Sequence, residues 1–118
     1  MAAATSTGGL LGKLAGRVGD SPLPGAGCWA DERVAVSCTE QGEYFIRAVA
    51  AADISARIRY GGQNLENAAM GALKDMQIQG GYGGVIALAA QGPPTHPFTA
   101  QGMRRAWCLG DDPIEVDV

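Results

Sequence analysis

The sequence predicts a layered α+β fold with an antiparallel component. Two apolar runs typical of buried strands, at residues 34–39 and 85–89, flank two segments with helical periodicity, at about 42–60 and 64–79. The strands carry apolar residues on both faces, whereas each helix has one apolar face, so the helices are expected to cover one side of a sheet. The other side also needs a cover, and no third long helix is predicted. We therefore expect half of a sandwich.

The N-terminal region is predicted to be a short strand followed by a long loop. Residues 2–6 are small and suit a strand, whereas residues 8–25 contain six glycines and two prolines, which no regular element tolerates. Loops longer than about 12–15 residues within a compact domain are usually functional or disordered. Five apolar residues favour an ordered loop: Leu10, Leu11, Leu14, Val18 and Leu23. This loop is the first candidate for a site.

The first helix is expected over about 42–60. One apolar stripe joins Phe45, Val49, Ala52 and Ala56. Asp53 and Arg57 are spaced for an ion pair one turn apart, and Gly61-Gly62 is expected to end the helix.

The second helix is expected to begin after Asn64, a favourable N-cap residue, and to end at Gly80-Gly81. Its apolar positions follow the helical repeat: Leu65, Ala68, Ala69, Leu73 and Met76. Beyond the strand at 85–89, Pro93 and Pro94 restrict any strand to an edge, and residues 97–98 and 103–107 are short extended candidates.

Composition excludes several classes of protein. The net charge is −3 and the nine Lys and Arg residues are scattered, so no nucleic-acid partner is predicted. No apolar run approaches the roughly 20 residues that span a membrane, and the N-terminus has no signal-peptide pattern. The three cysteines show no C-x-x-C spacing, which favours reduced thiols in a cytoplasmic protein without a metal or other cofactor. The 18 glycines are not periodic and indicate many special backbone positions.

The most informative motif is Arg17-Val18-Gly19-Asp20-Ser21-Pro22. Opposite charges three residues apart on a glycine-braced turn can face one site. A guanidinium suits a carboxylate and a carboxylate suits an ammonium, so the pair complements the zwitterionic end of an amino acid. A solvated surface ion pair is the alternative that the motif alone leaves open.

Three other motifs are less specific. The segment from Thr7 to Leu14 resembles a phosphate-binding loop but lacks its first glycine and its final hydroxyl. Ser37-Cys38-Thr39 ends a strand before a helix, where hydroxyls either cap the helix or stabilise an oxyanion. His96 has no acidic or cysteine neighbour and is interpreted as a loop histidine.

Several blocks together resemble the β subunit of plant-type (isoaspartyl peptidase) asparaginases, which are N-terminal-nucleophile hydrolases. They run in family order and spacing: Ala4–Gly9, Gly16–Pro22, Gly25–Gly27, Val36–Thr39, Gly42-Glu43, Phe45–Arg47, Gly80–Gly84, Pro97-Phe98, Gly102-Met103 and Arg105–Trp107. Related glycosylasparaginases usually have asparagine where Gly8 stands, which favours the isoaspartyl peptidase branch.

The resemblance implies a four-layer αββα sandwich formed by a self-cleaving precursor, of which residues 1–118 are an incomplete β-subunit part of one domain. It implies an (αβ)2 assembly with the α subunit of the same precursor, and L-asparagine and isoaspartyl dipeptides as substrates. An N-terminal threonine attacks the side-chain amide and forms an acyl-enzyme.

The resemblance also assigns site residues. Thr7 would hydrogen-bond the nucleophile, Arg17 would hold the substrate α-carboxylate and Asp20 its α-ammonium group. Thr39 and the N–H of Glu40 would form the oxyanion hole, and the Gly42 carbonyl would assist with the ammonium group.

Two features depart from the family. Its nucleophilic threonine lies upstream of the Ala4–Gly9 block, so this chain alone is expected to lack the nucleophile and to be inactive. Glu40 stands where most members have glycine, so its Cβ restricts the backbone and its carboxylate opposes a developing oxyanion. A non-catalytic amino-acid-binding module and an unrelated α/β scaffold are the alternative interpretations.

Overall fold

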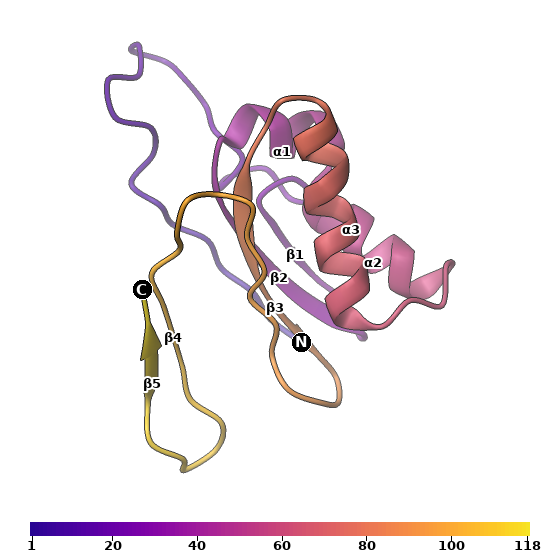
Figure 1. Ribbon diagram of the computed structural model, residues 1–118. Coiled ribbons are helices and arrows are strands. Elements are labelled where there is room, and N and C mark those ends of the chain that lie inside the picture. Colours follow the sequence, from indigo (N-terminus) through magenta and orange to yellow (C-terminus); the bar gives the residue numbers. More distant parts are fainter.

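A three-stranded antiparallel sheet with helices on one face forms the body of the molecule (Figure 1). The computed structural model describes residues 1–118. The sheet consists of β1 (Cys28–Ala30), β2 (Val34–Glu40) and β3 (Gly83–Ala89), in that spatial order. The predicted α+β class, its antiparallel component and the two main strands are confirmed.

Three helices follow β2: α1 (Gly42–Ala48), α2 (Ala50–Arg59) and α3 (Leu65–Ile78). A separate hairpin of β4 (Arg105–Trp107) and β5 (Glu115–Asp117) projects from the body (Figure 1). No helix combines the length and the apolar character needed to cross a membrane.

The core lies between the sheet and the helices. Alternate residues of β2 point into it, and Val34, Val36 and Cys38 are all at most 1% exposed. In the β2–β3 register Val36 faces Ala87 and Cys38 faces Val85, so both strands present small or β-branched side chains to the helices. On the opposite face Ile86 and Leu88 of β3 are 42% and 41% exposed, so this chain leaves that face partly uncovered.

The helix expected over 42–60 is two helices, which corrects the prediction. Val49 has a left-handed backbone with φ of 47° and separates α1 from α2. The first N–H groups of α2 bond to the glycine-rich loop: Ala51 N donates to Ala26 O at 3.1 Å and Ala52 N to Gly25 O at 2.9 Å. These long-range bonds break the predicted stripe, so Val49 is half exposed and Ile54 is buried instead.

The second helix matches its prediction. Asn64 Oδ1 accepts from Asn67 N at 2.8 Å, which confirms the N-cap, and Gly80 follows the helix with a φ of 89°. The predicted ion pair between Asp53 and Arg57 is also confirmed, at 2.6 Å. Arg57 pairs in addition with Asp75 of α3 and so ties the two helices together.

Residues 2–6 do not form the predicted strand. They make no backbone–backbone hydrogen bonds. The segment is held by its side chains: Thr5 Oγ1 donates to Gly27 O at 2.9 Å and lies 2.6 Å from Ser37 Oγ. Small residues suit close approach to a sheet, but a ladder requires backbone groups in register, and none is formed here.

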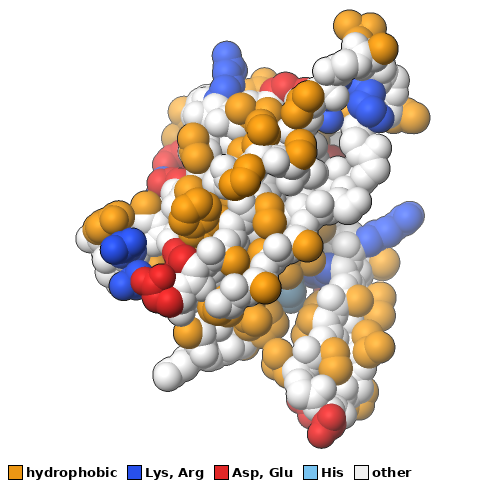
Figure 2. Space-filling model, turned by 180° about the vertical axis from the view of Figure 1, so that it is seen from behind, with side chains coloured by type: hydrophobic (Ala, Val, Ile, Leu, Met, Phe, Trp, Pro, Cys, Tyr) orange, Lys and Arg blue, Asp and Glu red, His pale blue; other side chains and the backbone are white.

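The loop after it is confirmed, since no helix or strand occurs before Cys28. Two of its apolar residues do not pack on this chain, however, since Leu11 is 100% and Leu14 84% exposed. Apolar side chains stand on this projecting loop and on the hairpin (Figure 2). The order of the loop stays a prediction, and its exposed side chains leave apolar surface that this chain does not cover.

The segment that follows Pro93 and Pro94 was predicted to lie at the edge of the sheet, and this is confirmed. Thr95 exchanges two hydrogen bonds of 2.8 Å with Ala87, and Thr99 N donates to Gly83 O at 2.8 Å. Segment 95–99 thus lies along the outer edge of β3, where the proline rings interrupt no central ladder.

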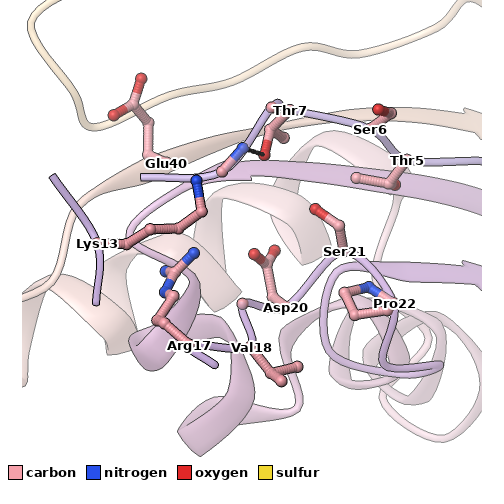
Figure 3. Close-up of a pocket in the computed structure, with 13 residues that line it drawn as sticks. Thr5, Ser6, Thr7, Lys13, Arg17, Val18, Asp20, Ser21, Pro22 and Glu40 are labelled. Carbon is pink, nitrogen blue, oxygen red and sulfur yellow. Dashed lines mark hydrogen bonds between the residues drawn. The ribbon is translucent and has the colours of Figure 1, made fainter. Parts of the chain in front are cut away.

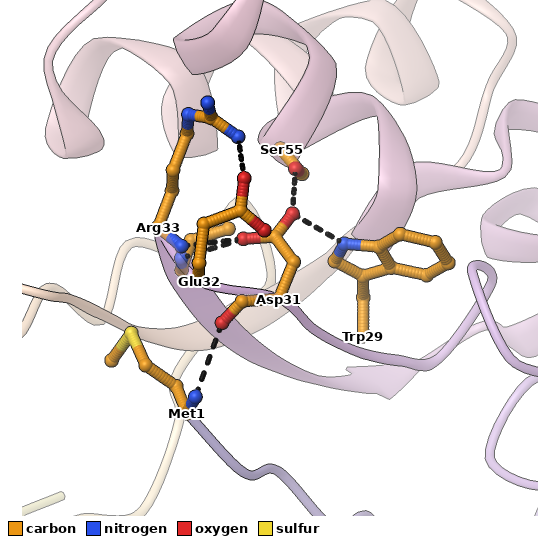
Figure 4. A network of polar contacts seen from close by, with 7 residues as sticks. Met1, Trp29, Asp31, Glu32, Arg33 and Ser55 are labelled. Carbon is orange, nitrogen blue, oxygen red and sulfur yellow. Dashed lines mark hydrogen bonds and ion pairs between the residues drawn. The ribbon is translucent and has the colours of Figure 1, made fainter.

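A turn between β1 and β2 is organised by one carboxylate (Figure 4). Asp31 Oδ2 accepts from Trp29 Nε1 at 3.0 Å and from Ser55 Oγ, and Oδ1 accepts from the backbone N–H groups of Arg33 and Val34. Burial alone raises the pKa of this carboxyl, but the four donors stabilise its charged form, and together they lower the pKa well below its usual range.

Asp31→Asn is expected to lower the free energy of unfolding at pH 7 by about 1–2 kcal/mol, because an amide is a poor acceptor for four donors. The lowered folded-state pKa means that this stabilisation is complete above the unfolded pKa, about 4, and is lost as pH falls through the folded value. Thermal unfolding at pH 7 and pH 3 should therefore show a smaller difference between the two proteins at pH 3. Asp111→Asn, at an exposed turn, is the control, and a difference independent of pH would contradict the role of the charge.

Candidate functional site

An open pocket of about 380 Å³ lies where the N-terminal segment and the glycine-rich loop meet the end of β2 (Figure 3). Four residues predicted for the site line it: Thr7, Arg17, Asp20 and Glu40. Segments that are distant in the sequence therefore form one concave surface.

Arg17 and Asp20 reach this pocket from the same turn (Figure 3). Asp20 is only 4% exposed, and its Oδ2 is buried without a hydrogen-bond partner, as is Nη2 of Arg17. Burial raises the pKa of the Asp20 carboxyl, although the nearby Arg17 opposes this effect. Buried polar groups without partners cost free energy, so a ligand that bonds to both would be favoured.

Two glycines hold Asp20 closely. A Cβ on Gly42, the first residue of α1, would lie 2.5 Å from Asp20 Oδ1 and 3.2 Å from Arg17 Nη2. A Cβ on Gly27 would lie 2.6 Å from the carbonyl carbon and oxygen of Asp20. Glycine is required at both positions because any side chain would displace the carboxylate.

Glu43 is a site residue that the sequence analysis missed. Its Oε1 accepts from Arg17 Nε at 2.7 Å, and this bond lowers the pKa of Glu43. One side of the guanidinium is thereby engaged, while Nη2 is left without a partner. Gly42-Glu43 is one of the blocks that resemble the family. The sequence alone does not show that Glu43 pairs with Arg17, because the two residues are 26 positions apart.

Thr39 does not line the main pocket, although Thr7 does. The two threonines border a smaller neighbouring pocket together, and Thr39 and Glu40 border a third. Thr7 Oγ1 accepts from Gly9 N at 3.3 Å, which helps to bend the start of the loop. The predicted residues therefore gather in one region, with Thr39 on its border.

Two other polar residues differ in their relation to the pockets. Lys13 lines the main pocket beside Arg17 and was not predicted to do so. His96 packs against Trp107, with ring centroids 4.6 Å apart, and lines none of these pockets. No group of three or more His, Cys, Asp or Glu side chains is placed to hold a metal ion.

Glu40 has a backbone conformation that favours glycine. Its φ is 97°, and its side chain is exposed at the end of β2. For a residue with a Cβ such a conformation costs on the order of 1–3 kcal/mol.

Glu40→Gly is therefore expected to raise the free energy of unfolding by about 1 kcal/mol, less than the full strain because glycine loses more backbone entropy on folding. Thermal or urea unfolding would measure the gain. Glu40→Ala keeps the Cβ and serves as the matched control. Equal stabilisation by both substitutions would mean that the carboxylate, and not the backbone, is the cause.

Comparison with known proteins identifies the family. Residues 1–117 match the family described as Asparaginase. The chain belongs to the plant-type asparaginase/isoaspartyl peptidase family. It is 53% identical over 116 residues to the isoaspartyl peptidase of Escherichia coli, covering 96% of this chain and 36% of that protein.

Two further relatives belong to the same family by name. The isoaspartyl peptidase/L-asparaginase of Xenopus laevis is 38% identical over 120 residues, covering 100% of this chain and 38% of the relative. The plant-type L-asparaginase of Pyrobaculum calidifontis is 66% identical over 47 residues, or 39% of this chain and 16% of the relative. The chain thus spans about a third of the length of the full-length family members.

Proposed function

We propose that these 118 residues provide the amino-acid-binding part of a threonine-type hydrolase that cleaves isoaspartyl peptides and L-asparagine. The observation that carries the proposal is the convergence of Arg17, Asp20 and Thr7 on one pocket, with buried Nη2 and Oδ2 atoms that have no partner in the chain. One cation and one anion at this spacing complement an α-carboxylate and an α-ammonium group. The proteins it resembles carry these activities in their names.

In this proposal the chain orients the substrate. The free edge of Arg17 binds the α-carboxylate, and Asp20 binds the α-ammonium group with help from the Gly42 carbonyl. Thr39 Oγ1 and the N–H of Glu40 stabilise the oxyanion that forms on the side-chain amide. Arg17 is already held by Glu43, so little side-chain entropy is lost when the carboxylate binds.

The nucleophile in this proposal is a threonine outside these 118 residues, whose own amine acts as base and whose hydroxyl is hydrogen-bonded by Thr7. It attacks the amide carbon, the amine leaves, and water then releases aspartate from the acyl-enzyme. The chain alone is expected to have no turnover, because loss of a covalent nucleophile lowers rates by many powers of ten.

We further propose that the chain is part of a four-layer αββα sandwich completed by the α subunit of the same precursor, in an (αβ)2 assembly. The exposed Ile86 and Leu88 on the open face of the sheet support this, as does the fully exposed Leu11. A second layer over that face would bury these side chains.

The test compares the chain alone with a joined protein, in which the segment that precedes the matched region in the E. coli relative is fused to residue 1. Ammonia release from L-asparagine is expected from the joined protein only. Turnover by the chain alone would refute the assignment of the nucleophile. A folded joined protein that binds aspartate but releases no ammonia would instead support an amino-acid-binding module.

A further inference from the structure

Glu40 borders a second pocket that the proposed chemistry does not use. This pocket has a volume of about 610 Å³ and lies between Glu40, the end of α3 and the segment around Thr99. Its lining includes two residues with side-chain amides, Gln77 and Gln101, whereas the hydroxyl of Thr99 is already hydrogen-bonded to Gly83. Glu40 is the one charged side chain among its nine lining residues. The pocket therefore presents a negative charge, and no cationic side chain is among its lining residues.

The two pockets meet at Glu40, which lines both. The carboxylate of Glu40 points away from Arg17 and Asp20 (Figure 3). If the N–H of Glu40 binds the oxyanion, the bond to be cleaved lies beside this residue. The aspartyl half of the substrate occupies the Arg17–Asp20 side, so the leaving half must continue past Glu40.

We propose that the second pocket is a leaving-group subsite that selects a cationic amino acid, so that β-aspartyl-lysine or β-aspartyl-arginine is preferred over neutral or acidic peptides. This inference rests on the proposed function. A positively charged side chain in this pocket would meet the carboxylate of Glu40, whereas an acidic one would be repelled. The strained backbone conformation of Glu40, with φ of 97°, is consistent with a role for its side chain.

A third pocket also borders Glu40, but it contains Arg104. Its charges are balanced, and it is smaller, at about 470 Å³. A leaving group that entered there would gain little from a positive side chain. A leaving group in the second pocket should therefore show a preference for a cationic side chain, whereas one in the third pocket should show none.

The test uses the joined protein with β-aspartyl-lysine, β-aspartyl-norleucine and β-aspartyl-glutamate, of which the first two differ mainly in one charged amine. We expect kcat/KM to be up to about fivefold higher for the lysine than for the norleucine peptide, the upper end of the effect of one partly exposed charge pair. The ratio of kcat/KM for the lysine peptide to that for the norleucine peptide should fall to about one in Glu40→Gln. In the unsubstituted protein it should decrease in 0.5 M salt, which screens the charge pair. Glu66→Gln, an exposed substitution on α3, should leave it unchanged.

Three results would each overturn the inference. They are equal kcat/KM values for the lysine and norleucine peptides, a preference for lysine that remains in Glu40→Gln, and a preference for the glutamate peptide. If no peptide is hydrolysed, calorimetric binding of the same peptides replaces the rates. A Glu40-dependent preference in binding without turnover would refute the proposed hydrolase and retain the subsite. Binding without any preference would refute the subsite as well.

Discussion

Arg17→Ala is expected to lower kcat/KM of the joined protein for L-asparagine by about 10²–10³-fold, because it removes one partner of a largely desolvated charge pair. The side chain of Arg17 is only 16% exposed, and its Nη2 has no partner in the chain. The substitution would also leave Glu43 without its partner and Asp20 without its neighbouring cation. Ammonia release under saturating and limiting substrate would separate kcat from KM.

Two further variants show whether the effect depends on the guanidinium group of Arg17. Arg17→Lys keeps the charge but loses the fork of N–H donors, so an intermediate loss of about tenfold is expected. Arg59→Ala removes an exposed arginine that lies over Tyr60 and should leave the rate unchanged. If Arg17→Ala and Arg59→Ala have the same effect, the guanidinium does not bind substrate.

Asp20→Asn should abolish binding of the ammonium group without lowering stability at pH 7. Burial raises the pKa of Asp20 in the folded chain, so its contribution to stability is complete below the unfolded pKa and is lost as pH rises through the folded value. At pH 7 the charged form is therefore a cost that the amide relieves. In the unsubstituted protein, kcat/KM should fall on the acid side with a midpoint above that of an ordinary aspartate.

Gly27→Ala is expected to destabilise the protein by about 3 kcal/mol, because overpacking against backbone atoms cannot be relieved by a rotamer change. The new Cβ would lie 2.6 Å from the Asp20 carbonyl carbon and 2.7 Å from its Oδ2. Gly27 cannot easily move away, because its carbonyl accepts from Cys38 N and Thr5 Oγ1, both at 2.9 Å. Urea unfolding of the joined protein would measure the loss.

Gly102→Ala is the matched control for Gly27, because a Cβ there meets nothing within 4 Å. Its effect on stability should stay within about 0.5 kcal/mol. A similarly small effect of Gly27→Ala would show that the turn around Asp20 is more adaptable than its contacts indicate.

Local patterns predicted the elements whose stability is local or strongly periodic. The apolar runs of β2 and β3 and the Asn64 cap of α3 were found because side-chain alternation and capping depend on near neighbours. The same holds for Arg17 and Asp20, since two side chains three positions apart on one glycine-braced turn must lie close together. Their charges indicated a zwitterionic ligand, and the resemblance of whole blocks to a family added the role expected of each residue.

Long-range hydrogen bonds determined what the sequence could not show. The break at Val49 arises because N–H groups of α2 bond to carbonyls of the loop at Gly25 and Ala26. The pairing of Arg17 with Glu43 and the contact of Gly27 with Asp20 likewise join distant segments. Residues 2–6 have strand composition but no backbone partner, and Leu11 and Leu14 of the loop are not covered by any surface of this chain.

By itself, then, the sequence determined the α+β class, the glycine-rich loop and the two charges that it carries. Only the tertiary structure decided which groups hold those charges and which atoms remain free to bind. The physical reason is that a spacing along the chain limits the directions of neighbouring side chains, whereas burial and partners depend on segments brought together by folding.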